Sequence, residues 1–364
     1  MRSFMICASH GDSPSFRIKN SDESAKGEYL RLPVEKYGGA ILYSWFDRPL
    51  SVAGRVVLRT ERGIKSELVN IDRDLLSIPS VAIHLNRGVN DGFSPNVAAD
   101  MIPLYSILGN EKGIRDIVAE FLSVDAKNIL SHDLFLYARS EPCRFGASEE
   151  FVLTPRFDDL GCVFASLEAF LSAKDTDSTP VLAVFDNEEV GSDTKQGAAS
   201  TFLRDLLFRL CSSEVEYIRA LSRSFMVSAD NAHAKHPNHP EFSDADNAPI
   251  LTGGIVIKHN ANQKYATDAI SDALFSQICV RAKLKTQAYY NRADIPGGST
   301  LGSISNTRVS VPTVDIGIPQ LAMHSAVETA AVSDILDMRK ALTEFYSSEI
   351  NVCGNEIEIK SAKM

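Results

Sequence analysis

The sequence lacks the features that define several classes of protein. No apolar run approaches the roughly 18 to 20 residues that a helix needs to cross a bilayer, so we expect no membrane partner. The start, MRSFMICASH, lacks the pattern of a secretory signal peptide. Lys and Arg number 37 against 47 Asp and Glu, a net charge of −10, and they form no basic cluster. Because binding to phosphates needs a basic face, we expect no nucleic-acid partner.

Cysteine is scarce, and its spacing is not that of a disulfide framework. None of the six cysteines belongs to a C-x-x-C pair, and several fall inside apolar helical patterns. This spacing indicates buried thiols in a reducing compartment rather than disulfides or a zinc knuckle. We therefore expect a cytoplasmic protein.

The remaining composition is that of a globular protein, with 44% apolar and 23% charged residues. Over residues 150–364, short runs rich in branched and aromatic residues alternate with segments of helical apolar spacing. Strands are expected at 181–186, 224–230, 253–258, 286–291 and 313–318, and helices at 159–173, 201–211, 266–284 and 327–348. This alternation predicts an α/β sheet with helices on both faces.

Residues 51–150 interrupt this pattern. They contain an expected hairpin around the turn Glu61-Arg62-Gly63, a Gly/Asn/Pro loop at 86–96 and one helix, IRDIVAEFL. Because this section has its own periodicity, we expect residues 51–150 to form an inserted domain. The main domain is then discontinuous and comprises residues 1–50 and 151–364.

Polar clusters follow two of the apolar runs. His10-Gly11-Asp12 follows FMICAS, and Asp186-Asn187-Glu188-Glu189 follows VLAVF. Residues i and i+2 of a strand project to the same side, so Asp12 can orient the His10 ring. The first cluster alone is also compatible with a capped turn. The second places three acids in four residues beside a strand, which is costly to bury without a cation; a solvated loop is the alternative.

Three further clusters supply acids and histidines. Asp158-Asp159 begins the helix 159–173, where a cap needs only one acid. Asp230 ends the strand 224–230 and precedes three histidines in an H-x-x-H-x-x-H run, whose prolines favour a loop. We therefore prefer Asp230 over those histidines as a ligand. His324 lies between a strand and the last helix.

Together the clusters offer two histidines and three or four carboxylates at the ends of strands, where open α/β sheets bind ligands. That set suits two borderline divalent cations, such as zinc, cobalt or manganese, with one bridging carboxylate. A spare carboxylate beside the metals would be the general base for a bridging water.

Seven stretches of this chain resemble the aspartyl aminopeptidase family, in the order of that family and from about residue 5 to about residue 345. They are HGDSP, SWFDRPLSVAGRV, DNEEVGS, SADNAHAKHPN, YATD, PGGSTLG and MHSAVE. The resemblance implies a mixed-sheet metallopeptidase core interrupted by a β-rich dimerisation domain. It also implies a hydrolase that removes N-terminal Asp or Glu from peptides through a water bridging two zinc ions.

The resemblance implies a set of metal ligands. His10 and Asp230 would bind one metal, and Glu189 and His324 would bind the second. Asp158 would bridge both.

It also implies the catalytic and substrate-binding residues. Glu188 would be the general base, and Asp12 would orient the imidazole that binds the first metal. His84 of a neighbouring subunit and Lys258 would meet an acidic substrate side chain, and the loop with Gly298 and Ser299 would line the site.

Members of the family form homo-oligomers, commonly dimers assembled into dodecamers, which implies the same assembly here. Two alternatives stay open. One is a neutral-residue aminopeptidase of the wider co-catalytic zinc group, and the other is a catalytically impaired assembly or cargo protein of the same fold.

Overall fold

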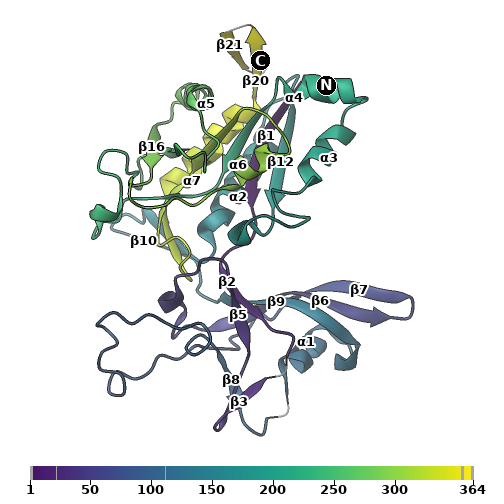
Figure 1. Cartoon of the computed structure of the whole chain (residues 1–364), viewed down its shortest axis with the longest axis vertical. Helices are drawn as coiled ribbons and strands as arrows, with labels where there is room; N and C mark the ends of the chain where they lie inside the picture. The colour runs from purple at the N-terminus through teal and green to yellow at the C-terminus, as the bar shows by residue number, and fades with distance from the viewer. Residues whose placement is uncertain (1–2, 22, 111, 354–355, 362–364) are drawn as a thin grey trace. The chain divides into compact units, whose positions relative to one another are not determined.

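The computed structural model describes residues 3–21, 23–110, 112–353 and 356–361. The chain divides into two compact units (Figure 1). The first comprises Met1–Ser13, Cys143–Met323 and Glu328–Met364, and the second comprises Pro14–Pro142 and His324–Val327. Residues 14–50 thus fall in the second unit, whereas the sequence placed the boundary at residue 51. The dimerisation role expected for this part of the chain stays a prediction.

The first unit is built on a six-stranded mixed sheet of order β12-β1-β13-β17-β15-β16. Its strands are β1 (Phe4–His10), β12 (Thr179–Phe185), β13 (Phe225–Ala229), β15 (Ile255–His259), β16 (Thr286–Tyr290) and β17 (Thr313–Gly317). Neighbouring strands are parallel except β15 and β17. Every residue of β1 is buried, as in sheets covered on both faces. The five strands predicted for this region are confirmed.

Helices cover both faces of this sheet, as predicted. Met5 and Cys7 of β1 join the core on the side of α2 (Phe157–Ser172), α5 (Ala269–Arg281) and α7 (Val332–Tyr346). Phe4 and Ile6 join the core on the side of α3 (Phe202–Arg209), α4 (Glu214–Leu221) and α6 (Leu301–Asn306). Successive residues of β1 alternate between the two cores because successive side chains of a strand point to opposite faces.

The last helix begins later than its sequence pattern indicates. The expected helix at 327–348 starts only at Val332, because Glu328–Ala331 form β19 and pair with β11 (Phe151–Thr154). These two strands belong to a second sheet of order β10-β11-β19-β18-β14. Its other strands are β10 (Cys143–Phe145), β14 (Ala232–His233) and β18 (Pro319–Leu321). A hairpin of β20 (Ser348–Cys353) and β21 (Glu356–Ser361) follows α7.

One face of α2 carries exposed apolar side chains at helical spacing. Leu160, Phe164, Leu167 and Leu171 are 40%, 54%, 43% and 70% exposed. The neighbouring strand β12 ends the sheet, and β1 is its one pairing partner among the described residues. Val184 of β12 is 43% exposed.

The second unit has its own sheet and core. Its sheet has the order β5-β2-β9-β6-β7, with β2 (Ser15–Ile18), β5 (Val34–Tyr37), β6 (Leu50–Thr60), β7 (Gly63–Asn70) and β9 (Ile129–Ala138). The predicted hairpin is confirmed as β6 and β7, and the predicted helix as α1 (Ile114–Leu122). A small sheet joins β3 (Ser24–Lys26), β4 (Tyr29–Arg31) and β8 (Leu104–Ile107). Phe16 and Trp45 meet edge to face in the core.

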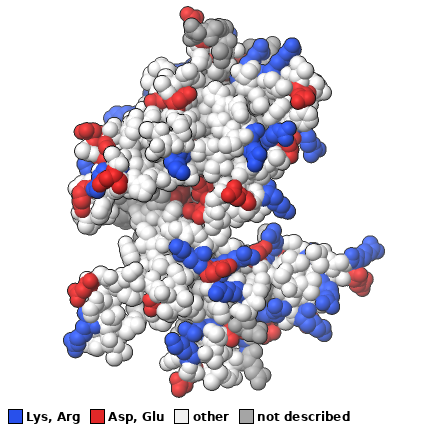
Figure 2. All heavy atoms as spheres, in the orientation of Figure 1, with Lys and Arg blue, Asp and Glu red and all other residues white. Residues whose placement is uncertain are grey.

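Two further observations bear on the sequence predictions. Within the described part of the chain, no helix is long and apolar enough to cross a membrane. The cysteines at 7, 143, 162, 211 and 279 are free thiols. Buried thiols were predicted, but Cys143 is exposed and Cys211 is half-buried. The side chain of Cys353 lies outside the described residues. Acidic and basic side chains are interspersed over the face seen in Figure 2.

Candidate active site

Four predicted site residues come together at the carboxyl edge of the main sheet. His10 is the last residue of β1, and Asp230 follows β13 directly. Glu188 and Glu189 lie in a single 3-10 turn, η3 (Glu188–Val190), just after β12. Because β12, β1 and β13 are adjacent and parallel, their carboxyl ends lie side by side.

A buried cluster of three potential metal ligands forms there. The His10 Nε2 atom lies 3.6 Å from Asp158 Oδ1 and 3.7 Å from Asp230 Oδ1. One ligand atom from each of the three residues lies within 4.8 Å of the other two. The three residues are 1%, 3% and 8% exposed. This cluster contains three of the five predicted ligands.

In its neutral form, His10 is held in the tautomer whose Nε2 lone pair faces the two carboxylates. Its Nδ1 atom lies 3.1 Å from the backbone oxygen of Asp12 and 3.4 Å from the Asp12 carboxylate. A carbonyl oxygen can only accept, so Nδ1 carries the proton and donates it. The neutral ring then presents Nε2 as a ligand, which is how metal-binding histidines are held in proteins.

Asp12 also holds the turn that carries the two glutamates. Its carboxylate accepts the backbone N–H of Glu188 at 3.1 Å and that of Glu189 at 3.2 Å. One side chain therefore connects the end of β1 to η3.

The segment around Asp158 is fixed from three directions. The Glu328 carboxylate accepts the Asp158 N–H at 2.8 Å, and Ser13 Oγ donates to the Asp158 carbonyl at 2.7 Å. Asn231 Nδ2 donates to the Phe157 carbonyl at 2.8 Å. Glu328 has no predicted role, because in the sequence only its place in MHSAVE marks it and its hydrogen-bond partner lies 170 residues away.

The electrostatics of the site call for a cation. Burial, reinforced by the charge of Asp230, raises the pKa of Glu188 to about 8. Burial likewise raises the pKa of Asp159 well above its ordinary value. Burial alone would lower the pKa of His10, but hydrogen bonds to the surrounding carboxylates raise it well above its usual value. Acids packed this closely are compensated either by protons or by metal ions, so the donor set fits divalent cations.

The other predicted site residues come from further parts of the chain. Lys258 of β15 is buried, and its Nζ lies 3.2 Å from Asp230 Oδ2. Gly298 and Ser299 are exposed in the loop before α6. His84 lies in an exposed loop of the second unit, and His324 also belongs to that unit, where its Nδ1 lies 3.3 Å from the Gly39 carbonyl. The roles of these five positions stay predictions.

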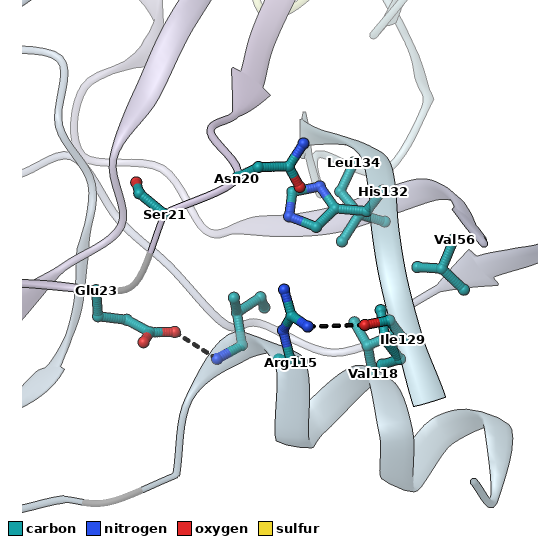
Figure 3. Close-up of a pocket in the computed structure, with 10 residues that line it drawn as sticks. Asn20, Ser21, Glu23, Val56, Arg115, Val118, Ile129, His132 and Leu134 are labelled. Carbon is teal, nitrogen blue, oxygen red and sulfur yellow. Dashed lines mark hydrogen bonds between the residues drawn. The ribbon is translucent and has the colours of Figure 1, made fainter. Parts of the chain in front are cut away.

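A cleft in the second unit is not a competing active site. Glu23, Arg115 and His132 line it between α1 and β9 (Figure 3). Glu23 Oε1 accepts the Ile114 N–H at 2.5 Å, and Arg115 Nη1 donates to the Ile129 carbonyl at 2.7 Å. Both charged groups are thus tied to the backbone and hold α1 in place.

The fold and the buried donor set are those of a metal-dependent hydrolase. A family model described as aminopeptidase I zinc metalloprotease (M18) matches residues 1–346, and the chain belongs to this family. It is a metallo-aminopeptidase, which confirms the class of enzyme expected from the sequence. The expected preference for N-terminal Asp or Glu stays a prediction.

Relatives and solved structures agree with this assignment. A probable M18 family aminopeptidase 2 of Clostridium acetobutylicum is 44% identical over 357 residues, 95% of this chain and 82% of the relative. One of Pseudomonas paraeruginosa is 39% identical over 351 residues, 95% and 82% of the two chains. The chain is also similar to a chain in the cryo-EM structure of the Ape4 and Nbr1 complex, with a TM-score of 0.91 and 35% identity. The match covers 95% of this chain and 71% of that chain. A chain of the S. cerevisiae mApe1 dodecamer matches with a TM-score of 0.81 and 26% identity. That match covers 95% of this chain and 80% of the mApe1 chain.

Proposed function

We propose that this aminopeptidase removes N-terminal Asp or Glu from peptides and uses two divalent metal ions, zinc rather than cobalt or manganese. The observation that carries the metal-dependent chemistry is the buried cluster of His10, Asp158 and Asp230 with Glu188 beside it. The zinc metalloprotease family supports zinc as the metal.

We assign the ligands as the sequence predicts. His10 and Asp230 would hold one ion, Glu189 and His324 the other, and Asp158 both. When bound, such ions acidify a water molecule and polarise the scissile carbonyl group. Asp12 would keep the His10 ring in the tautomer that binds metal.

Glu188 would move the proton. It would accept a proton from the attacking water and then deliver it to the leaving amine. Its raised pKa suits this exchange, because a general base works best with a pKa close to the working pH.

The acidic preference needs positive charge near the substrate side chain. We propose that His84 of a neighbouring subunit and Lys258 supply it, with Gly298 and Ser299 lining the pocket. An acidic side chain entering a partly desolvated site requires such cationic partners.

We also propose that the protein is a cytoplasmic homo-oligomer, with dimers assembled into a dodecamer and the second unit at the dimer contact. One structure similar to this chain is itself a dodecamer, which supports the proposal. Free thiols support a reducing compartment.

The direct test measures release of Asp and Leu from matched anilide or peptide substrates, with and without a chelator. We expect chelator-sensitive release, faster for Asp. Equal rates for both substrates would instead support the neutral-residue alternative. No chelator-sensitive release from either would support the impaired assembly protein.

The role of His84 can be tested by mixing two inactive variants. Glu188→Gln subunits keep His84, and His84→Ala subunits keep Glu188. If His84 completes a neighbour's site, mixed oligomers should recover Asp release that neither variant shows alone. No recovery under conditions where the subunits exchange, checked by mass, would contradict the proposal.

A further inference from the structure

Lys258 is a buried cation whose partner is one of the metal ligands. The residue is 3% exposed, and its Nζ lies 3.2 Å from Asp230 Oδ2. Burying an ammonium without a partner costs far more than leaving it in water, so this contact decides where the side chain lies. The Nζ atom also lies 5.5 Å from the centre of the Tyr265 ring, a cation–π distance.

The two oxygens of Asp230 face different partners. Oδ2 faces Lys258 at 3.2 Å, whereas Oδ1 faces His10 Nε2 at 3.7 Å. Only Oδ1 is therefore directed at the three-residue ligand cluster. A carboxylate with neither oxygen engaged could rotate or offer both atoms to a metal.

The strand carrying Lys258 is held firmly enough to fix this arrangement. β15 lies between β16 and β17 in the main sheet, and Ile257 pairs with Ile316. The neighbouring Asp315 of β17 is fully buried and already bound: it accepts from Thr300 Oγ1 and from the Ala266 N–H, both at 2.6 Å. Lys258 thus has one direct ion-pair partner among the described side chains, which is Asp230.

We propose that Lys258 is a positioning residue that holds Asp230 to one-oxygen ligation at the His10 side of the metal site. This inference rests on the metal site proposed above and adds to the substrate role proposed there. A group that contacts the second oxygen of a metal-binding carboxylate orients that carboxylate and tunes the metal.

The test replaces the bound metal by cobalt, whose visible spectrum reports coordination. In Lys258→Met, Asp230 Oδ2 is released, so the number of ligands at one ion should rise and the molar absorbance per cobalt should fall. Cobalt should stay bound at the wild-type stoichiometry, because removing a nearby positive charge does not weaken attraction of the cluster for a cation. Lys258→Arg keeps the charge and should give a spectrum closer to wild type. Lys285→Met, which removes an exposed lysine, is the matched control.

A Lys258→Met spectrum identical to wild type would overturn the inference. If Lys258→Met then lost more activity on Asp substrates than on Leu substrates, Lys258 would have a role in substrate binding only. Should Lys258→Met fail to give a cooperative unfolding transition, Lys258→Gln, which keeps one N–H donor, is judged by the same spectral criterion. Wild-type protein that binds no cobalt would reject the metal site itself, an outcome separate from the role of Lys258.

Discussion

The carboxylate of Asp12 accepts a hydrogen bond from the backbone N–H of Glu188 at 3.1 Å, across 176 residues of sequence. The same carboxylate lies 3.4 Å from His10 Nδ1. Asp12 therefore sets both the orientation of an expected metal ligand and the place of the expected general base. Its substitution should disturb two functions at once.

We expect Asp12→Ala to lower both metal affinity and turnover, each by about 10- to 100-fold, as is usual for groups that orient ligands. Asp12→Asn should lose less, because its amide oxygen can still accept one backbone N–H. The measurements are zinc content after dialysis and kcat at saturating zinc. Equal effects of the two substitutions would show that the charge of Asp12 matters and its hydrogen bonds do not.

Glu188→Gln should nearly abolish peptide hydrolysis without releasing metal. Loss of a general base typically costs about 10²- to 10⁴-fold in rate, and glutamine cannot take the proton. Elemental analysis should find the wild-type metal content. Glu214→Gln on α4, an exposed and distant position, is the control and should keep full activity. Surviving turnover in Glu188→Gln would rule out our general base.

Metal should stabilise the folded protein. A ligand that binds only the folded state at 100 times its dissociation constant adds about 2.7 kcal/mol to the free energy of unfolding. Asp158 is one of the buried acids of the ligand cluster, so the stabilisation by metal should depend on it. Asp158→Asn should therefore unfold at nearly the same temperature with and without zinc. Thermal unfolding with and without a chelator checks this. A full zinc-dependent shift in the variant would place the metal elsewhere.

Asp334 should make stability fall between pH 4 and pH 6. It lies at the start of α7, accepts the Thr252 N–H at 2.8 Å, and burial raises its pKa to about 6, against 3.8 in the unfolded chain. Because the folded state keeps a proton that the unfolded state loses, this contribution is present below pH 4 and lost as the pH rises through 6.

Asp334→Asn stays neutral, so it should gain stability relative to wild type as the pH rises from 4 to 6, with no further change above. Urea unfolding at several pH values measures the difference. Asp246→Asn, at an exposed loop position, should show no such trend. A constant offset between Asp334→Asn and wild type across this range would contradict the raised pKa.

The sequence predicted those parts of the site that depend on local pattern. His10 and Asp230 were found because each ends an apolar run that forms a buried strand. Asp158 was found because an extra acid opens a helix of clear periodicity. Because β1 and β13 are parallel neighbours, their carboxyl ends place His10 and Asp230 side by side.

Contacts between distant strands could not be predicted in this way. The Lys258–Asp230 pair depends on the sheet order, in which β17 separates β13 from β15 although it follows both in sequence. The hydrogen bond from the Asp158 N–H to Glu328 could not be predicted for a similar reason. The segment of Glu328 has helical spacing, but pairing with β11 overrides that preference and delays the start of α7.

The apolar face of α2 and the edge of β12 have a consequence for how the protein behaves at high concentration. An unpaired strand edge is a template for pairing with another chain, and the leucines and phenylalanine beside it would be covered by that encounter. Sulfate and phosphate salts favour such burial, whereas cooling weakens it. Clouding of purified samples should therefore begin at this face, and a lysine at Leu171, its most exposed member, should delay it without touching the active site.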